Sequence, residues 1–252
     1  MKKLLTLAVG SLVLACLTSQ ISAQVFSDDF EAGLGNWAVS GGTTLDLSTA
    51  QNVVPVGGSQ SALLNLSSDR MFHNFGAELT GPTLASWSIY DSTGSRAYGQ
   101  VLAYSGDRFA SGTLQNLFAI GKYNSATMPG EVFDATKYQG RVVAGTSAGW
   151  FNLNATGAPS RSTGWHKFDI ERLADGTTYN YYVDGILSRT ITGVTDFTWD
   201  SITIGSVAAG TTAGDAFFDG VQVTVVPEPS TFAVIFGLLA LGTGLLRRRL
   251  QK

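Results

Sequence analysis

Residues 164–191 read GWHKFDIERLADGTTYNYYVDGILSRTI, and this stretch decides the fold. Positions 166–171 alternate, because the even positions hold His, Phe and Ile while the odd positions hold Lys, Asp and Glu. A period of two places one set on each face of an extended strand. Asp-Gly pairs at 175–176 and 184–185 are typical of tight hairpin turns. The stretch therefore predicts three consecutive antiparallel strands.

The rest of residues 24–225 shows the same pattern. Gly, Ser and Thr are abundant, and no stretch keeps an apolar period of 3.6 residues over three turns. Many short strands separated by turn residues predict an all-β, two-sheet sandwich. The strands expected outside the opening stretch are Val25–Phe30, Asn36–Ser40, Ser61–Leu66, Met71–Phe75, Leu84–Tyr90, Ala97–Tyr104, Leu114–Lys122, Arg141–Ala144, Trp150–Leu153, Ser201–Ser206 and Ala216–Val225.

Four segments resemble the concanavalin A-like (laminin-G-like) jelly roll. They are DDFE at 28–31, GWHKFDIER at 164–172, YVDG at 182–185 and FDGVQV at 218–223. The resemblance implies a curved jelly-roll sandwich over residues 24–225, whose concave sheet often binds sugar. A fold alone does not fix a function, so the chemistry has to be argued from the side chains.

The sequence favours a protein without catalytic residues. Some glycosidases of this fold carry Glu-x-Asp-x-x-Glu on one strand, and no such run occurs here. The nearest pair, Asp169 and Glu171, is expected to form a solvated face paired with Lys167 and Arg172. A Ser-His-Asp triad would need a histidine beside a nucleophile, and His166, one of the two histidines of the chain, is instead expected to be a hydrogen-bonded core or sheet-edge residue.

The N-terminus predicts export. Two lysines precede an apolar stretch, Leu4–Leu17, and small residues lead up to Ala23. This is the pattern of a secretory signal peptide, expected to span residues 1–23 with cleavage after Ala23. The tetrapeptide VLAC at 13–16 loosely resembles a lipobox, so lipidation of Cys16 is the alternative.

The C-terminus begins with a hinge and an apolar segment. Residues 226–230 read VPEPS, and the motif residues are Pro227, Glu228 and Pro229. Proline can neither continue a helix nor donate to a β-ladder, so an extended hinge is expected. Residues 231–246 are uncharged and mostly apolar, and as a helix they would span about 24 Å of the ~30 Å bilayer core.

A basic tail, residues 247–252, follows the predicted transmembrane helix. Its arginines, Arg247, Arg248 and Arg249, hold the C-terminus in the cytoplasm and place the rest of the chain outside. The order of motif, apolar segment and basic cluster resembles the PEP-CTERM sorting signal of bacterial surface proteins. The resemblance implies processing by a membrane exosortase, membrane contact through the helix before processing, and delivery to the cell envelope, surface or extracellular polysaccharide. A plain single-span tail anchor is the alternative.

The body is acidic and contains no cysteine. Residues 24–226 hold 10 basic and 18 acidic side chains, a net charge of −8. Nucleic acid requires clustered Lys and Arg, so it is not an expected partner. The single cysteine, Cys16, lies in the predicted leader, and a mature protein without it has no disulfide and no thiol chemistry.

Two carboxylates are expected among apolar neighbours on the terminal strands. Asp28 and Asp219 each share the parity of apolar residues on their strands, where an unpaired charge is costly. Because the first and last strands of a jelly roll commonly lie close together, Asp28, Asp29 and Asp219 are candidate ligands of a structural calcium ion. The alternatives are β-bulges that turn the carboxylates outward, or an arginine partner.

The segment 150–165 is too rich in loop-forming residues to be entirely strand. Its Trp150, Asn152 and Arg161 are candidates for a glycan-binding rim, through aromatic stacking and hydrogen bonds to sugar hydroxyls. The leading expectation is an exported, non-catalytic surface or matrix protein that binds polysaccharide or cell-envelope glycan. The alternatives are a purely structural matrix protein with no small ligand and a glycoside hydrolase of the same fold.

Overall fold

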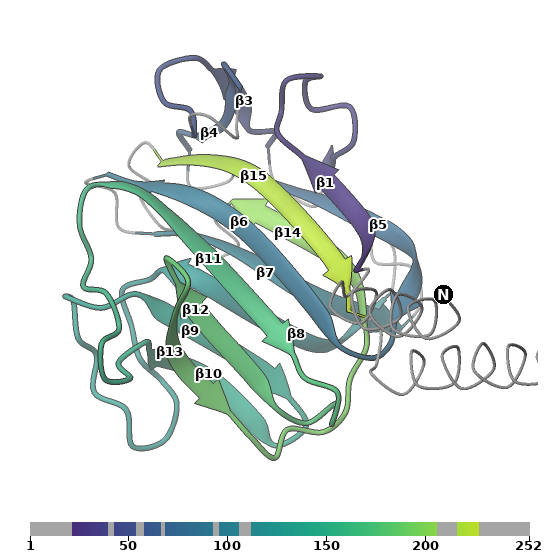
Figure 1. The fold of residues 1–252 in the computed structure, drawn as a ribbon, viewed down its shortest axis with the longest axis vertical. Coiled ribbons are helices and arrows are strands. Elements are labelled where there is room, and N and C mark those ends of the chain that lie inside the picture. The colour runs from purple at the N-terminus through teal and green to yellow at the C-terminus, as the bar shows by residue number, and fades with distance from the viewer. Residues whose placement is uncertain are drawn as a thin grey trace, which may run out of the picture. The chain divides into compact units, whose positions relative to one another are not determined.

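The computed structural model describes residues 22–39, 43–53, 58–66, 69–92, 96–105, 112–205 and 216–226. Within these ranges the chain forms fifteen β-strands and no helix, and residues 24–225 make one compact unit (Figure 1). The predicted all-β class is confirmed. Most of the predicted signal peptide, including Cys16, and the predicted motif, apolar segment and arginines after residue 226 lie outside the described residues. In the described part, no helix is long and apolar enough to cross a membrane.

The strands form two antiparallel sheets, with the eight-stranded sheet in front in Figure 1. That sheet runs in the order β13 (Ile186–Ile191), β12 (Tyr179–Val183), β11 (Gly164–Arg172), β6 (Thr83–Asp91), β15 (Ala216–Val225), β4 (Ser61–Leu64) and β3 (Asp46–Ser48), and β1 (Ala23–Asp28) pairs with β15 off this path. The seven-stranded sheet runs in the order β10 (Ser147–Asn152), β9 (Gln139–Ala144), β8 (Thr113–Lys122), β7 (Ala97–Ser105), β14 (Trp199–Gly205), β5 (Arg70–Leu79) and β2 (Ala38–Val39).

The opening stretch of the sequence forms β11, β12 and β13, as predicted. β11 pairs with β6 over its whole length, from Gly164 opposite Asp91 to Arg172 opposite Thr83. The turn between β12 and β13 places both of its central residues at positive φ, 51° for Asp184 and 75° for Gly185. A two-residue turn of this kind matches the twist of the strands that it joins, which explains the Asp-Gly pair.

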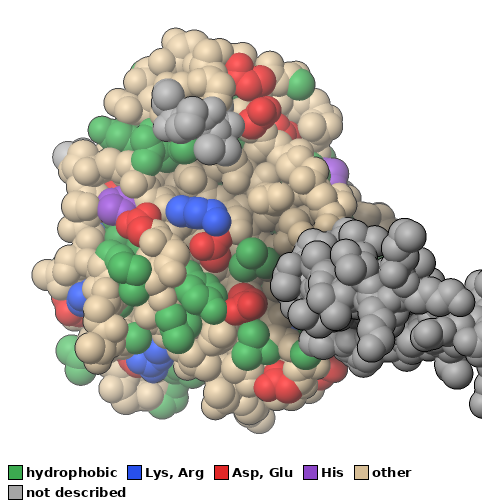
Figure 2. All heavy atoms as spheres, in the orientation of Figure 1, with side chains coloured by type: hydrophobic (Ala, Val, Ile, Leu, Met, Phe, Trp, Pro, Cys, Tyr) green, Lys and Arg blue, Asp and Glu red, His purple; other side chains and the backbone are tan. Residues whose placement is uncertain are grey.

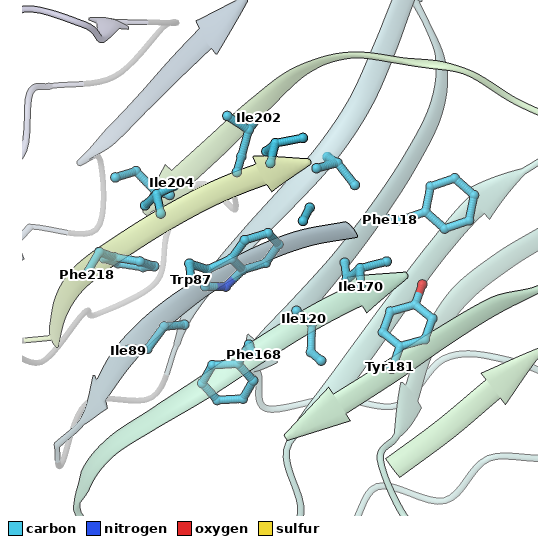
Figure 3. Close-up of a cluster of buried hydrophobic side chains, with 14 of the residues drawn as sticks. Trp87, Ile89, Phe118, Ile120, Phe168, Ile170, Tyr181, Ile202, Ile204 and Phe218 are labelled. Carbon is cyan, nitrogen blue, oxygen red and sulfur yellow. The ribbon is translucent and has the colours of Figure 1, made fainter. Parts of the chain in front are cut away.

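The main core lies between the two sheets (Figure 3). Alternate residues of both sheets point into it, among them Trp87, Ile89, Phe118, Ile120, Phe168, Ile170, Tyr181, Ile202, Ile204 and Phe218. The two sheets approach closely at Gly99, where an added Cβ atom would lie 2.5 Å from the indole of Trp87. Only a residue without a side chain fits at this point, because real Cβ atoms do not approach other atoms so closely.

A smaller apolar cluster lies on the outer face of the seven-stranded sheet. Its buried members are Tyr98, Leu102, Leu117, Ala119 and Trp150. The Tyr123 ring stacks on the Trp150 indole with centroids 3.8 Å apart, and the guanidinium of Arg141 lies over the same indole at 5.6 Å. This cluster uses aromatic residues for packing, which removes them from the set available to a ligand.

One strand of the described part was not predicted, and another is longer than predicted. β3, three residues at the edge of its sheet, carries no alternation long enough to be recognised. β5 extends to Leu79, whereas the pattern predicted a strand ending at Phe75. The other predicted strands lie within a few residues of the observed bounds.

Candidate functional site

One end of the core is polar. Three strands carry inward-facing apolar residues and then a buried polar residue at the inward position nearest the same end, namely Asp91 on β6, Lys122 on β8 and His166 on β11. Tyr138, just before β9, adds a buried hydroxyl group. Buried polar groups are costly unless they are hydrogen-bonded, so the partners at this end decide what it can do.

Asp91 connects the two sheets. Its Oδ1 lies 2.5 Å from Nζ of Lys122, which also donates to the carbonyl of Ser92 at 2.6 Å. Its Oδ2 accepts a hydrogen bond from the Tyr138 hydroxyl at 3.2 Å. Burial lowers the pKa of Lys122, and the carboxylate of Asp91 opposes that shift. The ammonium and carboxylate therefore hold each other in place, as a buried ion pair must.

An open pocket lies beside this ion pair, where β6 ends and β11 begins. These two strands are neighbours in Figure 1. It offers about 380 Å³ of accessible space. Its lining, which defines the end pocket, consists of Asp91, Ser92, Ala135, Arg161, Ser162 and Thr163. The loop before β11 is fixed by the backbone N–H of Arg161, which donates to the carbonyl of Thr136 at 2.8 Å. Charged groups and hydroxyl groups thus converge on one hollow.

Arg161 reaches Asp91 from the pocket side. Its Nε lies 3.5 Å from Oδ2 of Asp91, a long ion-pair contact, and its side chain is 21% exposed. The Nε–H is buried and has no hydrogen-bond partner among the described residues. The guanidinium of Arg161 is therefore held near a carboxylate without being saturated by it.

His166 lies next to the pocket and is hydrogen-bonded at both ring nitrogens, as predicted. Its Nδ1 lies 2.7 Å from Oδ2 of Asp184, in the Asp-Gly turn, and the other oxygen of that carboxylate accepts the backbone N–H of Lys167 at 2.8 Å. The hydrogen bond to Asp184 raises the pKa of His166, and burial opposes the rise. For Asp184, burial raises the pKa, but the bonds from His166 and Lys167 outweigh it and the net shift is downward.

Ser162, His166 and Asp184 are joined by contacts like those of a Ser-His-Asp catalytic triad, which the sequence did not predict. Nε2 of His166 lies 3.0 Å from the Ser162 hydroxyl and 3.0 Å from the Ser162 backbone carbonyl. A carbonyl oxygen can only accept, so this contact requires a proton on Nε2 while Nδ1 carries the proton that faces Asp184. The imidazolium form satisfies both contacts, and an imidazolium cannot take a proton from serine.

The carboxylate predicted on the first strand is buried but already occupied. Asp28 lies on β1, which pairs with β15 as expected. Its oxygens accept the backbone N–H of Phe30 at 2.7 Å, the amide of Asn36 at 3.1 Å and the indole N–H of Trp37 at 2.9 Å. Three donors stabilise this carboxylate without a cation.

The carboxylate predicted on the last strand is also buried. Asp219 accepts backbone N–H groups from Val53 at 2.9 Å and from Gly220 at 2.7 Å, next to a register shift in β15. Burial raises the pKa of Asp219 to about 6, and the charges of Asp29 and Glu31 add to the rise. Among the described residues no group of three or more His, Cys, Asp or Glu could hold a metal ion, so the calcium site stays a prediction. A melting temperature that changes neither on chelation nor on addition of calcium would contradict the predicted calcium site.

The three residues predicted to bind glycan are not equivalent. Trp150 is 4% exposed and packs in the outer cluster of the seven-stranded sheet. Asn152 is 3% exposed, and its side chain bonds to Glu131, the carbonyl of Val132 and the backbone N–H of Asp134. Neither residue has the free surface that a sugar needs, whereas Arg161 lines the end pocket.

The predicted polar face of β11 is confirmed in part. Lys167 lies 3.1 Å from Asp169, as expected, and Glu171 accepts the hydroxyl of Tyr182 at 2.6 Å. Asp169 is not solvated, however, because it is buried and accepts a hydrogen bond from the Ser86 hydroxyl. The expected partnership of Arg172 with this face is wrong, because Arg172 has the inward parity of the strand and is buried. Its guanidinium pairs with Asp196 and with the carbonyl of Gly81.

The comparisons with known proteins concern the fold. No family model and no curated protein sequence matches the chain. Among solved structures, the globular domain of calreticulin from T. cruzi is similar at 10% identity, with 84% of this chain and 92% of that chain covered and a TM-score of 0.51. Domain 4 of AbnA, a GH43 extracellular arabinanase from Geobacillus stearothermophilus solved with arabinotriose, is similar at 11% identity, with 81% and 93% covered and a TM-score of 0.50.

The fold is a concanavalin A-like jelly roll. The sheet orders and the coverage of whole domains in both comparisons agree with the resemblance read from the sequence. At this level of identity the likeness extends to the arrangement of strands and no further. In this jelly roll the end pocket brings the Asp91 carboxylate, the Arg161 guanidinium and the Ser162 and Thr163 side chains to one hollow.

Proposed function

We propose that the protein is an exported, non-catalytic surface or matrix protein that binds glycan in the end pocket. The observation that carries the proposal is the set of groups converging there: the Arg161 guanidinium, the Asp91 carboxylate and the Ser162 and Thr163 side chains around an open hollow of about 380 Å³. Sugar hydroxyls donate and accept hydrogen bonds, so a ligand of this class uses both kinds of group.

The pocket is held ready for a ligand by the contacts beneath it. Lys122 and Tyr138 fix the Asp91 carboxylate, and the bond from Arg161 to the Thr136 carbonyl fixes the loop. Groups that are already ordered lose little conformational entropy when a ligand arrives. Such preorganisation favours binding of a flexible polar polymer.

A row of three aromatic residues lies on the outer face of the eight-stranded sheet, and it begins two residues after Thr163. Trp165, Tyr90 and Phe217 lie side by side on β11, β6 and β15, and the Tyr90 ring meets Trp165 at 5.6 Å and Phe217 at 5.9 Å, both edge to face. Trp165 and Tyr90 are half-buried, so part of each ring faces solvent. A sugar ring can stack on such a surface, which gives Trp165 the role first expected for Trp150.

Two features support binding over cleavage. Glycoside hydrolysis uses two carboxyl groups that flank the scissile bond, about 5 Å apart or wider. The lining of the end pocket holds one carboxylate, Asp91, and Lys122 engages it. The Ser162 hydroxyl faces a histidine whose contacts favour the imidazolium form, which is no base for a nucleophile.

Export and sorting belong to the same proposal and rest on the sequence. The signal peptide, the Pro-Glu-Pro motif and the arginine tail would bring the jelly roll to the cell surface or the extracellular polysaccharide, with an exosortase as processing partner. The face in Figure 2 shows acidic and basic side chains scattered among mostly uncharged ones. The net charge of −8 over residues 24–226 fits a protein that avoids nucleic acid and anionic lipid.

The test is binding of the full chain to a glycan array and to insoluble polysaccharides. Arabinan oligosaccharides are a natural first arm, because the similar arabinanase domain was solved with arabinotriose. We expect Trp165→Ala and the near-isosteric Thr163→Val to weaken binding roughly tenfold. Leu47→Ala, an exposed apolar residue on β3, is the control and should bind as the wild type does.

Two outcomes would contradict the proposal. A folded full chain, judged by its thermal transition, that binds no glycan would leave the purely structural matrix role. Release of reducing sugar from any bound polymer would show that the protein is an enzyme.

A further inference from the structure

The Arg161 guanidinium differs from the other arginines that pair with carboxylates. Arg189 donates to Glu131 and Asn154, and Arg172 donates to Asp196 and to a carbonyl. Arg161 donates no side-chain hydrogen bond within the described residues, and its Nε–H, like that of Arg172, is buried without an acceptor. The terminal N–H groups of this partly exposed guanidinium therefore remain for a partner that comes from outside.

The charges at the end pocket do not cancel. Lys122 and Arg161 are two cations around one carboxylate, Asp91. The buried Lys122 ammonium takes the nearer oxygen of that carboxylate at 2.5 Å, whereas Arg161 is 3.5 Å from the other oxygen. One positive charge is left over, and it belongs to the residue that lines the pocket.

The neighbouring groups do not supply the missing negative charge. His166 and Asp184 form their own pair at 2.7 Å. Asp134 is exposed, and its carboxylate accepts hydrogen bonds from the hydroxyl and the backbone N–H of Thr136. Lys137 donates to the carbonyl of Ala158 and to the hydroxyl of Ser160. The pocket thus offers a local cation in a body whose net charge is −8.

We propose that the end pocket selects acidic glycans, with the Arg161 guanidinium binding the carboxylate of a uronic acid residue. This inference rests on the proposed glycan-binding function and names its ligand class. A planar carboxylate can occupy two N–H groups of the guanidinium fork with its two oxygens. A sulfate ester carries a third oxygen beyond the two that the fork can occupy. The Ser162 and Thr163 side chains remain for the sugar hydroxyls.

The experiment measures retention of the full chain on three polymers with EDTA present. The polymers are polygalacturonate, which carries carboxylates, dextran sulfate, which carries sulfates, and neutral arabinan. EDTA excludes a bridge through calcium. We expect retention on polygalacturonate that weakens as salt rises, because the contact is ionic. Arg161→Gln should weaken retention on polygalacturonate roughly tenfold. Arg161→Lys keeps the charge but loses the guanidinium fork, so its retention should lie between those of the wild type and Arg161→Gln.

Arg189→Gln is the matched control. Arg189 is also partly exposed and paired with a carboxylate, but it does not line the pocket, so this variant should be retained as the wild type is. Equal retention on arabinan and polygalacturonate would overturn the acidic preference and leave glycan binding intact. Stronger retention on dextran sulfate would overturn the choice of carboxylate. Retention on none of the polymers, nor on a glycan array, would overturn the proposed function itself.

Discussion

His166 connects the pocket loop to a hairpin turn through two hydrogen bonds. Because its pKa is raised in the folded protein, chiefly by the bond to Asp184, the protonated ring favours folding. This contribution is fully present below the pKa of an unfolded histidine, about 6.5, and is lost as pH rises through the higher folded value. We expect the loss of stability caused by His166→Gln to be larger at pH 5.5 than at pH 8.5.

Urea unfolding at the two pH values measures this difference. Carboxylates elsewhere titrate alike in both proteins and cancel in the comparison. Asp184→Asn is the control, since in its background the effect of His166→Gln should depend much less on pH. A difference between wild type and variant that is the same at both pH values would contradict the role given to the His166–Asp184 pair.

Ser162 lies at the distance from His166 that a nucleophile would have, but the contacts of His166 favour its protonated form, which cannot act as a base. The carbonyl at 3.0 Å from Nε2 competes with the hydroxyl for that nitrogen and favours a bound proton there. We therefore expect no labelling of Ser162 by a fluorophosphonate probe at neutral pH, and no ester hydrolysis above the rate of a Ser162→Ala variant. Labelling that is abolished by Ser162→Ala would show that the triad is active.

The strands of this jelly roll were predictable from the sequence because each carries its own information. Alternation from position 166 to 171 and an Asp-Gly turn define β11 and its hairpin locally. The end pocket was not predictable in the same way, since Asp91 and Lys122 lie on different sheets and meet only through the topology. A signal did exist, because both residues end a run of inward-facing apolar positions with a charge.

The misplacement of Trp150 has a related cause. Its strand, β10, lies at the edge of the seven-stranded sheet, and the sequence around it contains the Gly and Asn residues typical of loops. Stacking on Tyr123, 27 residues earlier in the sequence, buries it. The residues next to Trp150 in the sequence do not show whether its side chain packs on a neighbouring loop or is exposed to bind a ligand.

Contact between the sheets can be tested at Gly99 on β7. A methyl group at this position would meet the Trp87 indole, which is fully buried and has no room to retreat. We expect Gly99→Ala to destabilise the protein by about 1–3 kcal/mol, as overpacking of a core does. Gly157, whose Cβ would meet nothing but whose φ is +86°, is unsuitable as a control, whereas Gly35 has open space and no such φ. Thermal unfolding of Gly35→Ala should match the wild type.

The contribution of the ion pair between β6 and β8 to stability can be tested by substitution. Lys122→Met leaves Asp91 buried without its nearest cation and should destabilise the fold by roughly 3 kcal/mol. The double variant Lys122→Met with Asp91→Leu removes both charges and should recover part of that loss. Denaturant unfolding measures the stability of the single and the double variant. A double variant as unstable as the sum of the single variants would show that the charges do not act as a pair.

At the scale of the whole molecule, the jelly roll explains the binding proposal and the chain ends explain where binding would take place. An open pocket with a guanidinium that is not saturated by its carboxylate partner is useful to a protein surrounded by polymer, where many weak contacts along one chain reinforce each other. Most of the predicted signal peptide and all of the sorting segment after Val226 lie outside the described residues, so the location is a prediction from the sequence.

Mass spectrometry of the protein recovered from cells tests that location. We expect a mature N-terminus at Gln24, because small residues precede it, and a C-terminus near Pro227–Pro229, because an exosortase would act at this motif. The two termini discriminate between the alternatives: a lipidated Cys16 indicates a lipoprotein, and an intact tail through Lys252 indicates a retained anchor. Substituting the three arginines with glutamine should impair sorting, since they set the orientation of the span. Recovery of the unprocessed chain, with Met1 and Lys252 both present, from the cytosol would contradict export altogether.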